Sequence, residues 1–227
     1  MKRLLTVITA LTAALFTSEA ASDELKSVLK DLDSHIENSH IYVQQKQERI
    51  DQLRQKLEGA TCSETYDINY GLFEEYQSFR YDSAYFYANR SLELAGQMND
   101  QDKMARSRCA VVFCYMSSGL FLEAFDEMKK VDARNASLQV KKEYYSLYNR
   151  LYYDASDFND TENWSAEYTR LGTLYADSLM SIVPKESYDY IFAVAQSEIK
   201  HWHYSQCIDF YKQLLDEHTV SDHNKAI

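Results

Sequence analysis

Proline and glycine are scarce in this chain, which has one proline and five glycines among its 227 residues. Tight β-hairpin turns depend on these two residue types. Their scarcity argues against a fold built from short strands and hairpins, and it favours helices joined by short polar turns. With 45% hydrophobic residues, the chain can still bury a sizeable core. The sequence therefore predicts an all-α protein.

Motifs for enzymatic chemistry are missing as well. The sequence has no GxSxG nucleophile motif, no HExxH zinc motif, no glycine-rich phosphate loop and no paired CxxC. His201 and His203 stand two residues apart, so a helix would point them to different sides, whereas metal-binding pairs prefer a one-turn spacing. We expect a protein without catalytic activity, without a cofactor and without a metal site.

The chain also lacks an excess of positive charge. It carries 24 Lys and Arg residues against 35 Asp and Glu residues, which gives a net charge of −11. A nucleic-acid-binding surface needs a cationic patch that displaces counterions from the phosphates, and the basic residues here are scattered among more numerous acids. We therefore expect a protein or peptide as the partner of this segment, and no nucleic acid.

Cysteine is limited to Cys62, Cys109, Cys114 and Cys207. Cys109 and Cys114 are five residues apart and point to different sides of one helix, and Cys207 takes a small core position in the repeat described below. Free, buried cysteines are favoured over a disulfide framework. Pairing of the four thiols in an exported protein is the alternative.

The N-terminus has the order of an export signal. Lys2 and the arginine after it precede an apolar run over residues 4–16, and the small residues Ser18 and Ala20 follow. The run is shorter than the roughly 20 residues that a membrane-spanning helix needs. We predict a signal peptide over residues 1–20, cleavage after Ala20, and a periplasmic mature protein.

Residues 21–60 contain two amphipathic segments that predict an N-terminal helical hairpin. The apolar positions at helical spacing are Leu25, Val28, Leu29, Leu32 and Ile36 in the first segment and Ile50, Leu53 and Leu57 in the second. The second segment is polar and ends near Gly59. Its apolar pattern does not persist for three or four heptads, so a solvated helix that packs one narrow stripe on its neighbour is favoured over a coiled-coil dimer seam.

From residue 61 onward the chain repeats a pattern of aromatic and small residues. Ala84, Ala124 and Cys207 each follow an aromatic residue by three positions, and Ala166 can be placed between them, which gives spacings of 40, 42 and 41 residues. The pattern resembles the second helix of a tetratricopeptide repeat (TPR), where a small residue lets two antiparallel helices approach. It predicts a TPR-like α-solenoid over residues 61–227, with a repeat of about 40 residues.

The expected helix pairs cover residues 63–80 and 81–98, 101–118 and 120–132, 137–153 and 161–182, and 185–201 and 204–217. The third pair fits the pattern least, because a polar connection over residues 154–163 replaces the tight turn. Residues at helical spacing in its first helix are expected to be core: Tyr144, Tyr148, Leu151 and Tyr152.

The first helix of each pair is expected to line the concave side of the solenoid. Mixed aromatic, amide and cationic side chains suit the capture of a peptide. The alternative, which stays open, is that half of these side chains only pack against the next helix. The candidate binding residues are Tyr66, Asn69, Phe73, Tyr76, Gln77, Arg106, Phe113, Met116, Ser117, Phe192, Gln196 and Lys200.

Three segments together carry a resemblance to a known family. The segments Lys30–Glu37, Lys46–Leu53 and Phe73–Ala84, with the export signal, look like the uncharacterised TPR-type transcriptional regulators of Bacteroidetes. In that family a periplasmic repeat region is followed by a transmembrane helix, a cytoplasmic helical linker and a C-terminal helix-turn-helix domain. The resemblance implies no catalytic residue.

The resemblance implies a periplasmic sensor or protein-interaction region of a membrane-bound regulator. This chain stops at Ile227, so we interpret it as an N-terminal fragment or a truncated product, and membrane contact is expected only through a C-terminal part that the sequence does not include. The alternative is a free-standing secreted scaffold or chaperone-like adaptor for envelope proteins. The gene beyond codon 227 distinguishes the two functions.

Overall fold

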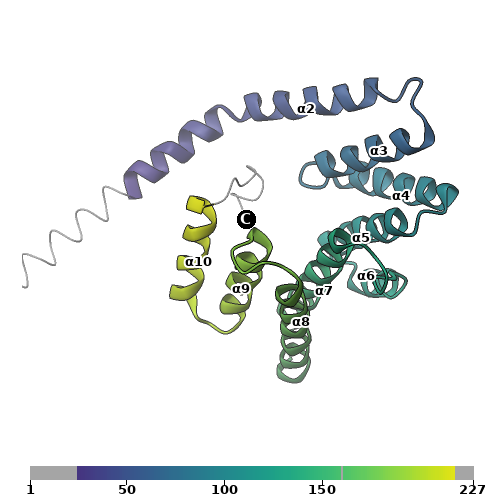
Figure 1. Ribbon diagram of the computed structural model, residues 1–227. Coiled ribbons are helices and arrows are strands. Elements are labelled where there is room, and N and C mark those ends of the chain that lie inside the picture. The colour runs from purple at the N-terminus through teal and green to yellow at the C-terminus, as the bar shows by residue number, and fades with distance from the viewer. Residues whose placement is uncertain (1–24, 160, 218–227) are drawn as a thin grey trace, which may run out of the picture. The chain divides into compact units, whose positions relative to one another are not determined.

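The computed structural model describes residues 25–159 and 161–217, and within these ranges every regular element is a helix. The chain divides into two compact units, one up to Gln52 and one from Leu53 onward. Figure 1 labels the helices. The predicted export signal and its cleavage site lie outside the described residues.

The first unit contains two helical segments in succession, residues 25–37 and the start of α2 (Ser39–Gln55). The expected hairpin is wrong, because only Asn38 separates them. Its N–H donates to the Ser34 carbonyl oxygen (3.1 Å), and the Ile41 N–H donates to the Asn38 carbonyl oxygen (2.9 Å). The helical hydrogen bonds thus carry the chain across the turn, and no glycine or proline stands there to reverse it.

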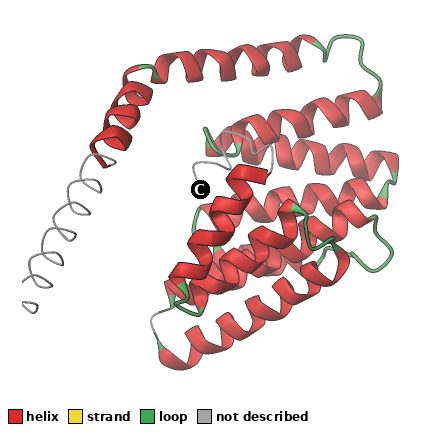
Figure 2. Cartoon of the chain, turned by 60° about the vertical axis from the view of Figure 1, so that its left-hand side comes forward, coloured by secondary structure: helices red, strands yellow, loops and turns green. Residues whose placement is uncertain are grey.

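The second unit is a series of helices that pack mainly on their neighbours in sequence. Figure 2 shows them side by side. The pairing is that of a TPR solenoid, and the predicted helix pairs are confirmed to within a few residues at most ends. The helices are α3 (Cys62–Tyr76), α4 (Tyr81–Met98), α5 (Gln101–Ser117), α6 (Phe121–Met128), α7 (Leu138–Phe158), α8 (Glu162–Ile182), α9 (Tyr188–Lys200) and α10 (Tyr204–Glu217).

The first helix of every pair begins at a side-chain cap. Thr61, Asp100, Ser137 and Ser187 each accept a hydrogen bond from a backbone N–H in the first turn of α3, α5, α7 and α9. At α3 the Glu64 side chain also bonds back to the Thr61 N–H, which completes a capping box. Polar residues between the pairs therefore fix where each first helix starts.

The helices of a pair meet at small residues, and here one prediction is corrected. Ala84, Ala124 and Cys207 are buried as expected, but Ala166 is exposed. In the third pair Gly172 takes the contact position instead, because a Cβ there would lie 2.5 Å from Cδ1 of Tyr153. The small contact residue of the third pair therefore lies further along α8 than predicted. The spacing of about 40 residues is not kept at this pair.

The α7–α8 pair has a tyrosine-rich core. Tyr148 and Leu151 are buried, and Tyr144 and Tyr152 pack against the same cluster, which confirms their predicted role. The Tyr148 ring stacks on the Tyr175 ring of α8 with 4.4 Å between centroids. Such pairs add to the stability that area burial alone provides. All four cysteines are free thiols, three of them buried and Cys62 exposed.

Candidate interaction surface

The first helices α3, α5, α7 and α9 carry a row of cationic side chains that reach from one helix to the next. We call the surface formed by these four helices the first-helix face. Each cation contacts a carboxylate or a backbone oxygen, and most also lie over an aromatic ring. The contacts are described below from α3 to α9.

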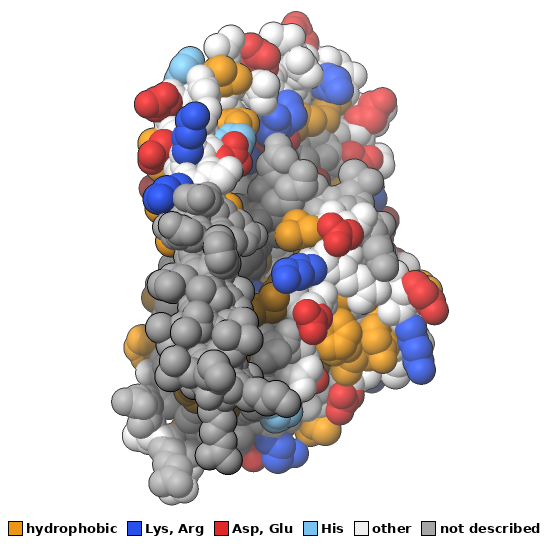
Figure 3. Space-filling model, turned by 90° about the vertical axis from the view of Figure 1, so that its left-hand side faces the viewer, with side chains coloured by type: hydrophobic (Ala, Val, Ile, Leu, Met, Phe, Trp, Pro, Cys, Tyr) orange, Lys and Arg blue, Asp and Glu red, His pale blue; other side chains and the backbone are white. Residues whose placement is uncertain are grey.

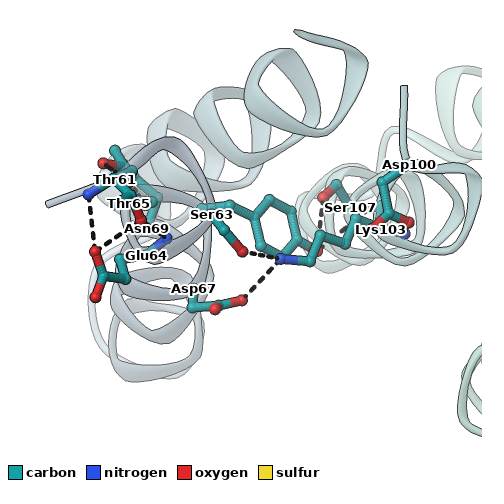
Figure 4. Close-up of polar contacts among 10 residues, drawn as sticks. Thr61, Ser63, Glu64, Thr65, Asp67, Asn69, Asp100, Lys103 and Ser107 are labelled. Carbon is teal, nitrogen blue, oxygen red and sulfur yellow. Dashed lines mark hydrogen bonds and ion pairs between the residues drawn. The ribbon is translucent and has the colours of Figure 1, made fainter. Parts of the chain in front are cut away.

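Lys103 of α5 reaches α3. Its Nζ donates to Ser63 Oγ (3.1 Å) and lies 3.2 Å from Asp67 Oδ1, as Figure 4 shows. The ammonium group also lies 4.3 Å from the centroid of the Tyr66 ring, within the range of a cation–π contact. One lysine thus joins the start of α5 to the start of α3.

Arg106, one turn further along α5, joins three helices. Its Nε donates to Glu143 Oε1 of α7 (3.0 Å), and its Nη2 lies 3.4 Å from Glu74 Oε1 of α3. The guanidinium carbon is 4.0 Å from the centroid of the Tyr70 ring. Because a guanidinium is planar and has five donors, one arginine can bridge two carboxylates and stack on a ring at once.

This cluster is partly withdrawn from water. Burial raises the pKa of Glu74, against the opposing pull of Arg106. Burial also raises the pKa of the Tyr70 hydroxyl, which therefore stays neutral at physiological pH. The second carboxylate oxygen of Glu143 is buried and accepts no hydrogen bond from the described residues. Arg106 is therefore held between Glu74 and Glu143, and Glu143 can still accept a further hydrogen bond.

Arg150 of α7 covers an aromatic ring at the centre of the face. Its guanidinium carbon lies 5.2 Å from the centroid of the Phe113 ring of α5, and its Nε lies 3.3 Å from Asp154 Oδ2. Burial raises the pKa of Asp154, although Arg150 acts in the opposite direction. The Arg150 side chain is 48% exposed. It can therefore contact a partner while remaining paired.

Two further cations connect α7 to α9. Lys200 donates to Asp157 Oδ1 (2.5 Å) and to the Tyr153 carbonyl oxygen (3.2 Å), and Lys142 pairs with Asp189. The row of bridges thus extends over all four first helices.

Five of the predicted binding residues are in the wrong place for a ligand. They are only 1% to 5% exposed, so a ligand has little of their side chains to contact: Tyr66, Asn69, Phe73, Tyr76 and Met116. The Tyr66 hydroxyl accepts from Ser107 Oγ (3.3 Å), and the Tyr76 ring stacks on the Tyr87 ring. Phe73 and Tyr76, which sequence analysis gave as candidate binding residues, are therefore part of the core.

The other seven predicted residues keep some exposure. Arg106 and Phe113 lie in the row of contacts described above, and Lys200 ends it. Gln77 caps the C-terminus of α3, and Ser117 is exposed at the end of α5. Phe192 and Gln196 turn toward α10, where the Gln196 amide donates to the Tyr211 hydroxyl (2.6 Å).

Sequence reasoning did not single out Lys103, Glu143, Arg150 or Glu74 as candidate site residues. A usable signal was present, since the paired residues are separated by 32 to 37 positions, close to one repeat. Glu127, which sequence reasoning did not single out either, is 13% exposed and pairs with Arg108 and Lys130.

Other kinds of site find no support in the part of the chain that the structure describes. No three His, Cys, Asp or Glu side chains gather there in a way that could hold a metal ion. None of its helices combines the length and apolar composition that crossing a bilayer requires. Figure 3 shows one side of the molecule, on which acidic and basic side chains are intermixed. The first-helix face therefore remains the best-organised surface.

A comparison with known families identifies the family to which the chain belongs. A family model described as the SusR N-terminal TPR domain matches residues 36–227. The chain belongs to this family. The match confirms the all-α TPR solenoid and the resemblance to the N-terminal part of the Bacteroidetes regulators. No curated protein matches the sequence. TPR domains mediate protein–protein interactions, and this SusR-type domain is accordingly a protein-interaction region.

Proposed function

We propose that the chain is the non-catalytic, periplasmic sensor region of a membrane-bound transcriptional regulator, and that it engages a protein or peptide through its first-helix face. The observation that carries the proposal is the row of partly exposed cations on that face, with Arg150, the most exposed of them, over Phe113 at its centre. The match to the SusR N-terminal TPR domain supports the regulatory part of the proposal.

The chemistry of the face fits an extended peptide. An arginine stacked on an aromatic ring offers a flat apolar surface and hydrogen-bond donors side by side. Arginine and aromatic side chains contribute much of the binding energy at protein interfaces. The carboxylates beside it are half exposed, so they can accept hydrogen bonds from backbone amides of a bound strand or helix. Because most of these charges already have partners, the energetic cost of ordering them before binding is small.

The periplasmic location and the regulatory context are tested by two direct measurements. The exported protein should have an intact mass that begins at Ala21. The gene should continue past codon 227 into an apolar run of about 20 residues and then a basic helix-turn-helix region. Retention of residues 1–20 would contradict export by cleavage, and a stop codon at that point would favour a free-standing scaffold.

The role of the face is tested by a matched pair of charge reversals. Arg150→Glu changes α7, while Arg90→Glu changes an arginine of similar exposure on α4, a second helix. Each arginine belongs to an exposed ion pair on its own helix, which contributes little to stability. Both variants should fold with unchanged circular dichroism, and Arg150→Glu should melt slightly lower than the wild type, because the new carboxylate faces the partly buried Asp154.

The readout is the transcriptome of cells that carry each variant in the chromosomal gene. Arg150→Glu should change the expression of a defined set of genes, and Arg90→Glu should leave it as in the wild type. If the two folded variants give the same transcriptome as the wild type, the first-helix face does not sense a partner.

A further inference from the structure

The first unit carries, near its N-terminus, an apolar stripe that its own described residues leave exposed. We call residues 25–43 the N-terminal arm. Soluble proteins rarely leave a continuous row of large apolar side chains in water. The side chains of the arm that are between 42% and 60% exposed are Leu25, Val28, Leu29, Leu32, Ile36, Ile41, Tyr42 and Val43.

The structure joins this stripe to the one in α2, which sequence analysis treated separately. Residues 25–55 are helical apart from the turn at Asn38. From Leu29 onward every seventh position is occupied by a large aliphatic residue: Leu29, Ile36, Val43 and Ile50 within this length, and Leu57 in the turn that follows α2. In heptad notation these are five successive a positions, and the d positions are Leu25, Leu32, Ser39, Lys46 and Leu53.

The C-terminal end of this seam is already a packing surface. In the second unit the methyl carbons of Leu53 lie 3.5 Å from the place that a Cβ on Gly71 would take, so this d position packs closely on α3. Ile50 is completely buried. The apolar a positions therefore continue from covered positions to the uncovered positions of the arm, while Lys46 and Ser39 occupy the d positions between Leu53 and Leu32.

We infer that the N-terminal arm is a self-association site, where a second copy of the chain covers the stripe as a coiled coil. The seven-residue period is the pattern that two supercoiled helices need, whereas a helix on a globular surface follows a period of 3.6. Every copy of the chain supplies the complementary seam, so no other partner has to be invoked.

The charge of the arm agrees with this occupant. It holds two lysines and three acidic residues, a net charge of −1, whereas the whole chain carries −11. Two arms can therefore meet without the repulsion that two acidic solenoids would have. The arm also has too few cations on its polar face for an anionic membrane surface, which interfacial helices attract with lysine and arginine.

The association should be weak. The uncovered seam has only six a and d positions, and Ser39 places a polar side chain at one of the d positions. Short coiled coils gain little beyond the cost of association, and a polar core residue lowers stability further. A dimer that forms at tens of micromolar and dissociates on dilution is expected.

Sedimentation equilibrium of the full chain over a range of concentrations tests the inference. The wild type should shift from monomer to dimer as concentration rises. Leu29→Glu combined with Ile36→Glu, both at a positions, should weaken association at least about tenfold. Ser39→Leu, which fills the polar d position, should strengthen it by about the same factor.

The matched control places two glutamates on the opposite side of the same helix. Ser27→Glu combined with Ser34→Glu adds the same charge at f positions and should leave the dimer as in the wild type. Unchanged melting of the solenoid in all three variants separates loss of the interface from loss of the fold. A wild type that stays monomeric at several hundred micromolar overturns the inference, and so does a dimer that tolerates Leu29→Glu with Ile36→Glu.

Discussion

The solenoid and the N-terminal arm have similar helical patterns, but of the two only the solenoid has a core of buried apolar side chains. Leu151 of α7 is completely buried between its neighbours, whereas Leu29 of the arm is 49% exposed. Both residues are leucines at the apolar positions of an amphipathic helix. The difference shows that periodicity determines which face of a helix is apolar, while the cover for that face comes from contacts far away in the sequence.

The largest expected effect comes from deleting one leucine in each region. Leu151→Ala should lower the free energy of unfolding of the solenoid by about 2–5 kcal/mol, because it leaves a cavity in a closed core. Leu29→Ala in dilute protein should change it by less than about 0.5 kcal/mol. Chemical denaturation followed by circular dichroism measures both. Equal losses would mean that the arm is packed as tightly as the solenoid.

The next effect concerns how closely two helices of the solenoid approach, for which the arm has no counterpart. Gly172→Ala should cost about 1–3 kcal/mol, because the new methyl group meets the Tyr153 ring and the Asn149 carbonyl oxygen. Gly96→Ala is the control, since no heavy atom lies within 4 Å of a Cβ at that exposed helical position.

Gly96→Ala should be neutral or stabilise the protein by up to about 1 kcal/mol. The measurement is the midpoint of thermal unfolding for both variants at one protein concentration. A Gly172→Ala variant as stable as the wild type would contradict the close α7–α8 contact.

The smallest effect concerns a partly buried carboxylate of the first-helix face, whereas every described residue of the arm is exposed. Burial raises the pKa of Asp154 in the folded state, so its charged form is disfavoured there. The wild type therefore loses stability as pH rises from the ordinary value of 3.8 through the raised pKa. Asp154→Asn removes this loss.

The melting temperature of Asp154→Asn relative to the wild type should therefore be higher at pH 7 and equal below pH 3.8. Asp209→Asn, at an exposed position of α10, is the control and should not reproduce the gain. A lower melting temperature at pH 7 would mean that the pair with Arg150 outweighs the burial of the carboxylate.

Local rules predicted most of the helices, because caps and apolar spacing are properties of neighbouring residues. The position of Ala166 was wrong because the small residue that α8 needs is set by Tyr153 on another helix, and only packing places Gly172 opposite that ring. In the first unit, the stripe was divided at a polar turn that the backbone hydrogen bonds of Asn38 in fact bridge.

The candidate surface was predicted less well for a related reason. Aromatic residues such as Tyr66 and Phe73 stand on the same helix as exposed acids, and spacing alone does not say which side meets α5. The contacts of Arg106 with Glu74 and Glu143 join three repeats. Pairs of opposite charge about one repeat apart were the available signal, but it becomes specific only when the register of the repeats is known.

Hydrogen exchange of the full chain at low and at high protein concentration tests the contrast between the two regions most directly. The amides of α5 and α7 should be slow to exchange at both concentrations, because their helices lie in a closed core. The amides of residues 25–43 should exchange rapidly in dilute protein and become protected as concentration rises. Full protection of the arm in dilute protein, or none at any concentration, would contradict the account.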